Sequence, residues 1–460
     1  MPKQIVIMEI LKYSKYNIIT PSYNDNGSCL LMNLRANKLL KISASTKRLI
    51  ECGVVPENPK IVKEFKESLI LVPSGEDELR TLLAENELAA LNQDGFQFTI
   101  FPSANCQLGC VYCGQEHTKD YLGDTYFEEI LATVDRNLAK GKKHLHIGWF
   151  GAEPMMGLKT IQSLTPKLKE KAAKYGCEYS SKITTNGLLL NKKNFEILLS
   201  HDVRKIFVSI DGTKKYHDER RFTKGGSGSF DVIMKNLKEI FNSDLDSSLF
   251  DLNMRVNVDR YNKEGVAPFL EMLAELGASK FVREYDIAPI HSWGNNADER
   301  SLTFEEFANF KIDMDIKLLE LGLMTEVPIP KRIKVVCQAV TKDAEYMDTK
   351  GNIFDCSEYP LVPGSKEKYS IGHITDTDGD ERKNKRNFSN WHDDIANKNL
   401  SGCKDCRILP VCGGACPKSW KEGNIPCPDT KLNIGETILL AYLHTKHKKT
   451  LFPQNELMVN

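Results

Sequence analysis

Residues 96–113 read FQFTIFPSANCQLGCVYC, an apolar strand-like run that ends at Cys106, Cys110 and Cys113. Alternating aromatic and β-branched residues favour a strand, and the cysteines follow it with gaps of three and two residues. Three thiolates at this spacing can wrap one face of a [4Fe–4S] cube and leave its fourth iron without a protein ligand. The alternative is a zinc site completed by His117, although zinc loops usually use paired two-residue gaps.

This strand is the first of a series. From about residue 96 to 288, strand-like runs alternate with helical ones, and the later strands read HLHIGWF, EYSSKITT, KIFVSID, LNMRVNVD and KFVREYDIA. Helical crossovers between strands predict a parallel sheet, so we expect an α/β fold with a partial (β/α)6 barrel of the TIM type. In a parallel barrel, ligands bind at the carboxyl ends of the strands.

Composition limits the class of protein. The chain has 460 residues with 41% hydrophobic residues, enough to bury a core, and its 62 basic and 62 acidic residues cancel. The zero formal charge gives no global attraction to nucleic acid or to an anionic membrane, so we expect neither as a partner. The N-terminus has no signal-peptide pattern and no run of 18 apolar residues occurs, which predicts a cytoplasmic protein.

The thirteen cysteines are unevenly distributed. Three form the triplet, seven lie between 337 and 427, and Cys29, Cys52 and Cys177 stand alone as expected core residues. Clustered thiols in a reducing compartment indicate metal sites. The region beyond residue 303 has one amphipathic helix and then little periodicity, so metal ligation is its expected source of stability.

The triplet, with Tyr112 before its last cysteine, resembles the radical S-adenosylmethionine (SAM) superfamily. That resemblance implies a [4Fe–4S] cluster on Cys106, Cys110 and Cys113 whose open iron binds SAM. It also implies one-electron cleavage of SAM to a 5′-deoxyadenosyl radical that abstracts hydrogen.

Residues at the ends of the next three strands extend the resemblance. Phe150-Gly151-Ala152-Glu153-Pro154 is similar to the family's Gly-Gly-Glu-Pro motif, with Ala152 in place of the second glycine. Later strands end at Thr185-Asn186-Gly187 and Ser209-Ile210-Asp211-Gly212, and Arg221 follows. The resemblance implies that SAM is bound by Gly151, Glu153, Asn186, Ser209 and Arg221. Read singly, Asn-Gly and Asp-Gly are ordinary turn signals.

The C-terminal cysteines resemble the seven-cysteine SPASM domain, which implies two auxiliary [4Fe–4S] clusters. One set is Cys403, Cys406, Cys412 and Cys427, and the other is Cys337, Cys356 and Cys416 with a fourth ligand that is cryptic or absent. The alternative is a pair of zinc ribbons, which the spacing around Cys403 and Cys406 favours but the five- and three-residue gaps that follow do not.

We predict five segments along the chain. Residues 1–95 form a small α/β module with a hairpin over 16–43, weakly similar to the PqqD-like elements that bind leader peptides by strand addition, or else a structural cap. The others are the radical SAM partial barrel (96–300), a bridging helix (301–336), the SPASM auxiliary-cluster domain (337–435) and a C-terminal tail (436–460).

SPASM enzymes mostly act on peptides and proteins, and two branches compete here. The first-choice function is a maturase that installs a crosslink, such as a thioether or carbon–carbon bond, in a ribosomally made precursor peptide with a leader. The second is sulfatase maturation to formylglycine, which the HSWGNN loop at 291–296 resembles. That branch has a catalytic aspartate directly after the cysteine corresponding to Cys356, where this chain has Ser357. A non-catalytic scaffold held by iron–sulfur or zinc sites is the third alternative.

The expected partners are the precursor peptide and a one-electron donor such as flavodoxin or ferredoxin. No catalytic residue beyond the cluster cysteines is predicted.

Overall fold

The computed structural model describes residues 9–376, 379–398 and 400–451 of the chain. It divides into two compact units. The first unit contains the residues up to Ala90, Glu326–Val336 and the residues from Asn390, and the second contains Leu91–Thr325 and Cys337–Ser389. In the described part of the chain, no helix is both long and apolar enough to cross a membrane.

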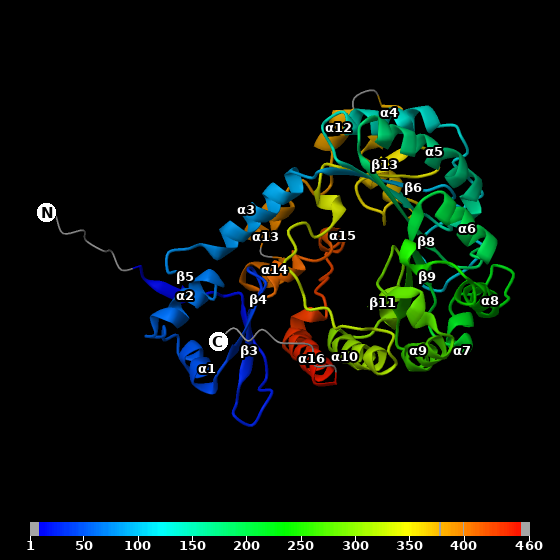
Figure 1. Cartoon of the computed structure of the whole chain (residues 1–460). Coiled ribbons are helices and arrows are strands. Elements are labelled where there is room, and N and C mark those ends of the chain that lie inside the picture. The colour runs from blue at the N-terminus through cyan, green and yellow to red at the C-terminus, as the bar shows by residue number, and fades with distance from the viewer. Residues whose placement is uncertain (1–8, 377–378, 399, 452–460) are drawn as a thin grey trace. The chain divides into compact units, whose positions relative to one another are not determined.

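The second unit is built on six parallel strands, as predicted (Figure 1). They are β6 (Gly95–Ile100), β7 (His144–Trp149), β8 (Glu178–Thr185), β9 (Val203–Ser209), β10 (Asp251–Val258) and β11 (Val282–Pro289), paired in sequence order. The connecting helices are α4 (Phe127–Leu138), α5 (Leu158–Lys174), α6 (Lys192–Ser200), α7 (Lys214–Asp218), α8 (Phe230–Phe241) and α9 (Val266–Glu275). This α/β order of strand and helix confirms the predicted fold class.

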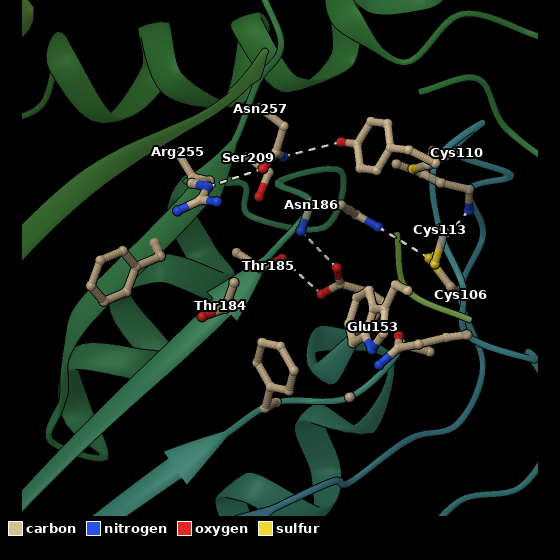
Figure 2. Close-up of a pocket in the computed structure, with 18 of the residues that line it drawn as sticks. Cys106, Cys110, Cys113, Glu153, Thr184, Thr185, Asn186, Ser209, Arg255 and Asn257 are labelled. Carbon is tan, nitrogen blue, oxygen red and sulfur yellow. Dashed lines mark hydrogen bonds between the residues drawn. The ribbon is translucent and has the colours of Figure 1, made fainter. Parts of the chain in front are cut away.

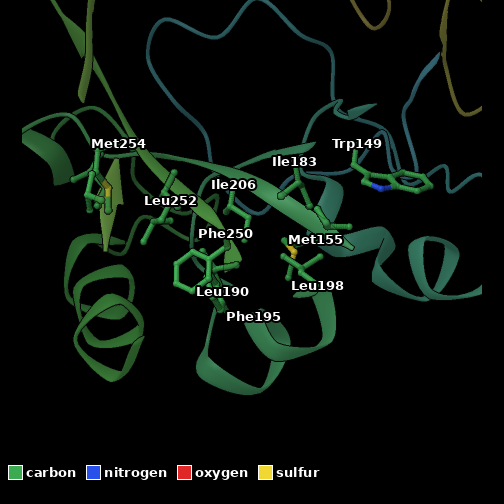
Figure 3. Close-up of a cluster of buried hydrophobic side chains, with 14 of the residues drawn as sticks. Trp149, Met155, Ile183, Leu190, Phe195, Leu198, Ile206, Phe250, Leu252 and Met254 are labelled. Atoms are coloured by element: carbon green, nitrogen blue, oxygen red, sulfur yellow. The ribbon is translucent and has the colours of Figure 1, made fainter. Parts of the chain in front are cut away.

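The core of this unit lies between the sheet and its outer helices (Figure 3). Ile183, Ile206 and Leu252 come from three neighbouring strands and pack with Phe195 and Leu198 of α6. Alternate residues of each strand point to opposite faces of the sheet. These residues face the helices, so their neighbours along each strand face the barrel interior. Helix starts are encoded locally: the side chain of Asn191 accepts a hydrogen bond from the Asn194 N–H and caps α6.

Residues after the barrel extend its sheet. β12 (Ala344–Met347) pairs in parallel with β6, and β13 (Asn352–Phe354) and β14 (Gly372–His373) continue the sheet in antiparallel pairs. All four residues of β12 are buried, including Glu345, whose carboxylate is paired with Arg382 at 3.2 Å. This strand was not predicted from the sequence, because AEYM is short and lacks the apolar alternation of an ordinary strand. Its buried glutamate is stabilised by an ion pair that the sequence does not reveal.

The remaining helices of the second unit are α10 (Phe304–Glu320), α11 (Ser365–Tyr369) and α12 (Gly379–Asn384). α10 is the predicted amphipathic helix after residue 303, and it begins with a capping box between Thr303 and Glu306.

The first unit joins the two ends of the chain. Its N-terminal elements are β1 (Leu11–Tyr13), β2 (Asn17–Ile19), β3 (Cys29–Asn33), β4 (Lys38–Ile42), α1 (Ala44–Glu51), α2 (Pro59–Glu67), β5 (Leu71–Pro73) and α3 (Glu78–Leu91). β1 pairs with β5, and β2, β3 and β4 form an antiparallel sheet. The C-terminal elements are α13 (Trp391–Lys398), α14 (Leu409–Cys412), α15 (Pro417–Lys421) and α16 (Thr430–Leu451).

These two ends share one hydrophobic core. Leu30, Met32 and Leu34 pack with Val411 and Ile438. The N-terminal residues are therefore packed with the cysteine-rich segment, and residues 337–435 belong partly to each unit. The expected tail over 436–460 is helical as far as it is described, since α16 continues to Leu451, and residues 452–460 lie outside the described part of the chain.

Candidate active site at the carboxyl ends of the barrel strands

A cavity of about 460 Å³ lies at the carboxyl ends of the barrel strands (Figure 2). It brings together every residue predicted for the first cluster and for SAM: Cys106, Cys110, Cys113, Gly151, Glu153, Asn186, Ser209 and Arg221. They come from the ends of β6, β7, β8 and β9 and from the segment after α7. The parallel sheet explains this convergence, because the carboxyl ends of its strands share one edge.

The cysteine loop is held by a segment far along the chain. The Gly109 N–H donates to the Phe222 carbonyl at 2.9 Å, and the Val111 N–H donates to the Arg220 carbonyl at 3.0 Å. On the other side of the loop, Gly114 is packed so tightly that a Cβ atom there would overlap the Trp293 carbonyl. These contacts fix the cysteine loop relative to Arg221, which lies inside the paired segment.

The three thiols lie in a buried setting suited to a metal cluster. Burial raises the pKa of Cys106 to about 12 and that of Cys110 to about 11, and the pKa of Cys113 is also raised by burial. The Cys106 Sγ accepts hydrogen bonds from the Leu108 N–H at 3.4 Å and the Asn186 Nδ2 at 3.6 Å. The thiols are therefore protonated without metal, and binding iron would release their protons.

His117, the candidate zinc ligand, lies next to the same loop. Its Nε2 is 3.8 Å from the Cys113 Sγ. Among the residues that the structure describes, no three Cys, His, Asp or Glu side chains are grouped as ligands of a single metal ion.

Glu153 is completely buried beside the cluster loop. Its Oε1 accepts from the Met155 N–H at 2.9 Å and the Thr185 hydroxyl at 2.7 Å, and its Oε2 accepts from the Asn186 N–H at 2.7 Å (Figure 2). Burial raises the pKa of Glu153, and these hydrogen bonds oppose that shift. A buried carboxylate with three fixed donors is positioned to accept a bond from a ligand ammonium.

Gly151 is required by its backbone conformation. Its φ is +119°, and a Cβ atom would lie 2.9 Å from the Ser103 carbonyl oxygen. Ala152, which replaces the family's second glycine, is not among the described non-glycine residues with positive φ. The departure from the family motif is therefore compatible with the local backbone.

We expect Gly151→Ala to destabilise the fold by about 1–3 kcal/mol, because it forces an L-residue into left-handed backbone against the Ser103 carbonyl. The matched variant Ala152→Gly should cost under about 1 kcal/mol, the entropic effect of a glycine in a loop. Urea unfolding of both variants measures the difference. Equal losses would contradict the backbone argument.

Sequence reasoning missed the group that holds Arg221. The Arg221 Nη1 donates to the Tyr112 hydroxyl, which donates to the Asp211 Oδ2 at 2.7 Å and accepts from the Asn257 Nδ2 at 3.1 Å. Arg220 is also buried, with its guanidinium 5.0 Å from the centre of the Tyr112 ring. The sequence Ser-Ile-Asp-Gly at the end of β9 was the available signal for this group, but its Asp-Gly step is also an ordinary turn signal, so Asp211 was not predicted to hold Arg221.

The loop over 291–296 closes one side of the cavity. The Trp293 Nε1 donates to the Glu358 carbonyl at 2.9 Å, and the Asn295 Nδ2 donates to the Tyr112 carbonyl at 3.2 Å. Ser357 and Glu358 line the cavity, so the residue that replaces the sulfatase-branch aspartate does face this site.

Four of the C-terminal cysteines meet in the first unit. Cys403, Cys406, Cys412 and Cys427 line one small cavity, and the pKa of Cys403 is raised to about 12, first by burial and then by the other three thiols. The loop after Cys412 bends sharply, with left-handed backbone at residues 413–415. The donor set and the curved loop fit a four-cysteine cluster.

The other predicted set is divided between the units. Cys337 and Cys356 lie in the second unit, where both share a cluster of buried aromatic residues and both raise the pKa of Tyr346 after burial does. Cys416 belongs to the first unit. No single unit therefore contains all three cysteines.

Residues 100–272 match the model of the radical SAM superfamily. This segment is a radical SAM domain, and the chain is an enzyme. The matched segment contains the cluster loop and all the residues of the cavity that we assign to SAM.

The chain is similar to a sulfatase-maturating enzyme and to a radical SAM cyclopropyl synthase. The chain is 23% identical over 347 residues to a cysteine-type anaerobic sulfatase-maturating enzyme of Clostridium novyi, covering 70% of this chain and 88% of that enzyme. It is 26% identical over 246 residues to the radical SAM cyclopropyl synthase TigE of Paramaledivibacter caminithermalis, covering 46% of this chain and 50% of TigE.

Among solved structures, native anSMEcpe with bound AdoMet and the Kp18Cys peptide has a TM-score of 0.53 at 16% identity. The match covers 76% of this chain and 99% of that one, and it demonstrates a shared fold. The radical SAM match over residues 100–272 supports SAM and one [4Fe–4S] cluster as cofactors.

Proposed function

We propose that this radical SAM enzyme is a SPASM-type maturase that installs a crosslink in a ribosomally made peptide. The main support for this proposal is one cavity, which is lined by Cys106, Cys110 and Cys113 together with Glu153, Ser209 and Arg221. When bound there, the cluster and SAM supply a carbon-centred radical that removes hydrogen from an unactivated carbon.

The residues of the chain itself would bind SAM and orient it. Glu153 would hold the amino group of SAM, Ser209 and Arg221 would contact its ribose and carboxylate, and Asn186 would complete the binding site. The Tyr112 and Asp211 contacts fix the direction of the Arg221 guanidinium. The loop over 291–296 lies against the cysteine loop and limits the access of solvent and dissolved reactants to the site, which prevents side reactions of a radical.

Two further cofactors belong to the proposal. Cys403, Cys406, Cys412 and Cys427 would hold one auxiliary [4Fe–4S] cluster, and Cys337 and Cys356 of the second unit would be ligands of the other. Their role would be to accept the electron released when the crosslink closes, and an oxidised one-electron carrier such as flavodoxin or ferredoxin would then remove it.

Sulfatase maturation is the second candidate, favoured by the match to the Clostridium novyi enzyme. Ser357 argues against it, because an alcohol hydroxyl is a much poorer general base than the aspartate carboxylate it replaces. TigE is a relative that modifies its substrate in a different way, so identity at this level is compatible with either reaction.

Co-expression with any small open reading frame found beside the gene, followed by tandem mass spectrometry, tests the assignment. A crosslink lowers the mass of the precursor by two hydrogen atoms and blocks fragmentation between the joined residues. Incubation with a sulfatase-derived cysteine or serine peptide tests the alternative, whose product is an aldehyde. Aldehyde formation with an unmodified precursor would replace our first choice by the second.

We also propose that the N-terminal elements bind the leader of the precursor. β4 is an edge of the β2–β3–β4 sheet and, in the described part of the chain, pairs with β3 alone. An exposed edge can accept a peptide as an additional strand through main-chain hydrogen bonds. Deleting residues 1–95 would not test this, because Leu30, Met32 and Leu34 complete the core around the C-terminal segment.

We expect free leader peptide, added in excess, to lower modification of the full precursor by about tenfold, because tethering supplies much of the substrate affinity. A leader methylated at alternate backbone nitrogens should not compete, since strand addition needs those N–H donors. Turnover of a leaderless core peptide is the control and should not respond to either leader. Equal competition by the methylated leader would contradict strand addition.

A further inference from the structure

One lysine lies directly against the four-cysteine site of the first unit. The Lys431 Nζ donates a hydrogen bond to the Cys427 Sγ at 3.5 Å, and Lys431 lines the same small cavity as Cys403, Cys406 and Cys412. No carboxylate within the described ranges forms an ion pair with it. The ammonium is therefore directed to the thiol group and is not neutralised by an acidic neighbour.

We propose that Lys431 raises the reduction potential of the auxiliary [4Fe–4S] cluster held by Cys403, Cys406, Cys412 and Cys427, an inference that rests on the cluster assignment in the proposed function. Four thiolates around an oxidised cubane give a net charge of two negative units, and reduction increases it to three. A cation near a ligand sulfur attracts the more negative state more strongly, so it favours reduction. A hydrogen bond to the sulfur acts in the same direction.

The fold adds a second positive contribution at the same place. The 22-residue helix α16 begins at Thr430, three residues after Cys427. The aligned peptide dipoles of a helix give its N-terminus a partial positive charge, and the effect is largest in the first turn. Lys431 lies in that first turn, so its side-chain charge and the helix terminus act together on the Cys427 side of the site.

The proposed chemistry gives this tuning a purpose. When a substrate carbon radical bonds to a neighbouring X–H group, a C–X bond forms, the X–H bond breaks, and one proton and one electron are released. The proton goes to solvent, and the electron converts an oxidised [4Fe–4S] cluster to its reduced state before an oxidised flavodoxin- or ferredoxin-class carrier takes it. Lys431 favours acceptance of that electron.

The test is an EPR-monitored redox titration of full-length reconstituted protein with Cys106, Cys110 and Cys113 replaced by Ala, which removes the signal of the first cluster. We expect Lys431→Met to lower the midpoint potential of one of the two auxiliary signals by about 59 mV, a tenfold fall in the reduction equilibrium constant. Lys431→Arg keeps the charge and should retain most of the potential. Lys431 is exposed, so these variants should fold.

The matched control is Lys404→Met. Lys404 lies between Cys403 and Cys406, is exposed, and has no contact to a thiol among the described residues. Its removal changes the net charge equally and should shift the potential much less. An equal shift in both variants, or none in Lys431→Met, would overturn the proposal. Failure of the cluster assignment itself would look different, because the protein before substitution at Lys431 would then give only one auxiliary signal or none.

Discussion

Replacing Cys106, Cys110 and Cys113 together by Ala should reduce 5′-deoxyadenosine formation to background while most of the iron stays bound. The reconstituted protein should hold about twelve irons if all three proposed clusters are cubanes, and the triple variant about eight. The reason is spatial: the triplet lines the barrel cavity with Glu153 and Arg221, whereas Cys403, Cys406, Cys412 and Cys427 line a different cavity. Iron analysis and chromatography of the SAM cleavage products measure both quantities.

Cys52→Ala is the control for this experiment. Cys52 is exposed and belongs to neither group of clustered cysteines, so its removal should change neither the iron content nor the cleavage of SAM. Loss of all iron in the triple variant would contradict independent sites. Continued formation of 5′-deoxyadenosine would contradict the assignment of the first cluster, and stoichiometric zinc with about four irons would identify the C-terminal sites as a zinc fold.

The residues predicted to bind SAM could be located in the sequence because they follow strands. Glu153, Asn186 and Ser209 each lie at the end of a predicted parallel strand, and that topology places such residues on one edge. The strands themselves have strong apolar periodicity, so the sheet order could be predicted before any contact was known.

The hydrogen bonds that support these residues could not be predicted from the sequence. Asp211, Tyr112 and Asn257 are hydrogen-bonded across separations of up to 145 residues, and nothing local in the sequence distinguishes Asp211 from a turn residue. Their role becomes visible only when the burial and the partners are known. Asp211 is fully buried, and a buried carboxylate is stable only when hydrogen-bond donors or cations surround it. Its surroundings therefore distinguish it from an ordinary turn aspartate.

The division of the chain was missed for a similar reason. Segment boundaries were drawn where composition and periodicity change, at residues 95 and 337. The core of the first unit instead joins β3 to α14 and α16, more than 370 residues further along the chain. Apolar residues at the two ends of a sequence carry no local signal that they pack together. Residues 1–95 were therefore predicted as a module separate from the C-terminal segment.

Asp211→Asn should destabilise the protein by about 3 kcal/mol, the cost of removing one carboxylate from a buried charge network in which Arg220 keeps only Asp259 as an ion-pair partner among the described residues. Asp211 is fully buried, lies 3.5 Å from the Arg220 Nε, and accepts hydrogen bonds from Tyr112 and the Asn257 N–H. The amide removes the negative charge and turns one acceptor into a donor facing those donors.

Asp202→Asn is the matched control, because Asp202 also pairs with basic side chains but at the surface. Exposed ion pairs contribute about 0–1 kcal/mol, so this variant should remain close to the parent protein in urea unfolding at neutral pH. Equal losses in the two variants would show that the buried charge network contributes no more than a surface pair.

The pH dependence provides a second readout of Asp211. Burial raises the pKa of its carboxyl, but the Arg221 and Arg220 charges outweigh burial, so the pKa in the folded state lies below the ordinary value. The stabilisation is therefore complete above the pKa of the unfolded chain and is lost as the pH falls through the folded-state value. Asp211→Asn should lack this dependence, and the gap in unfolding free energy between it and the parent protein should narrow in acid. A constant gap would mean that the asparagine disrupts packing and that the aspartate charge is not what stabilises the site.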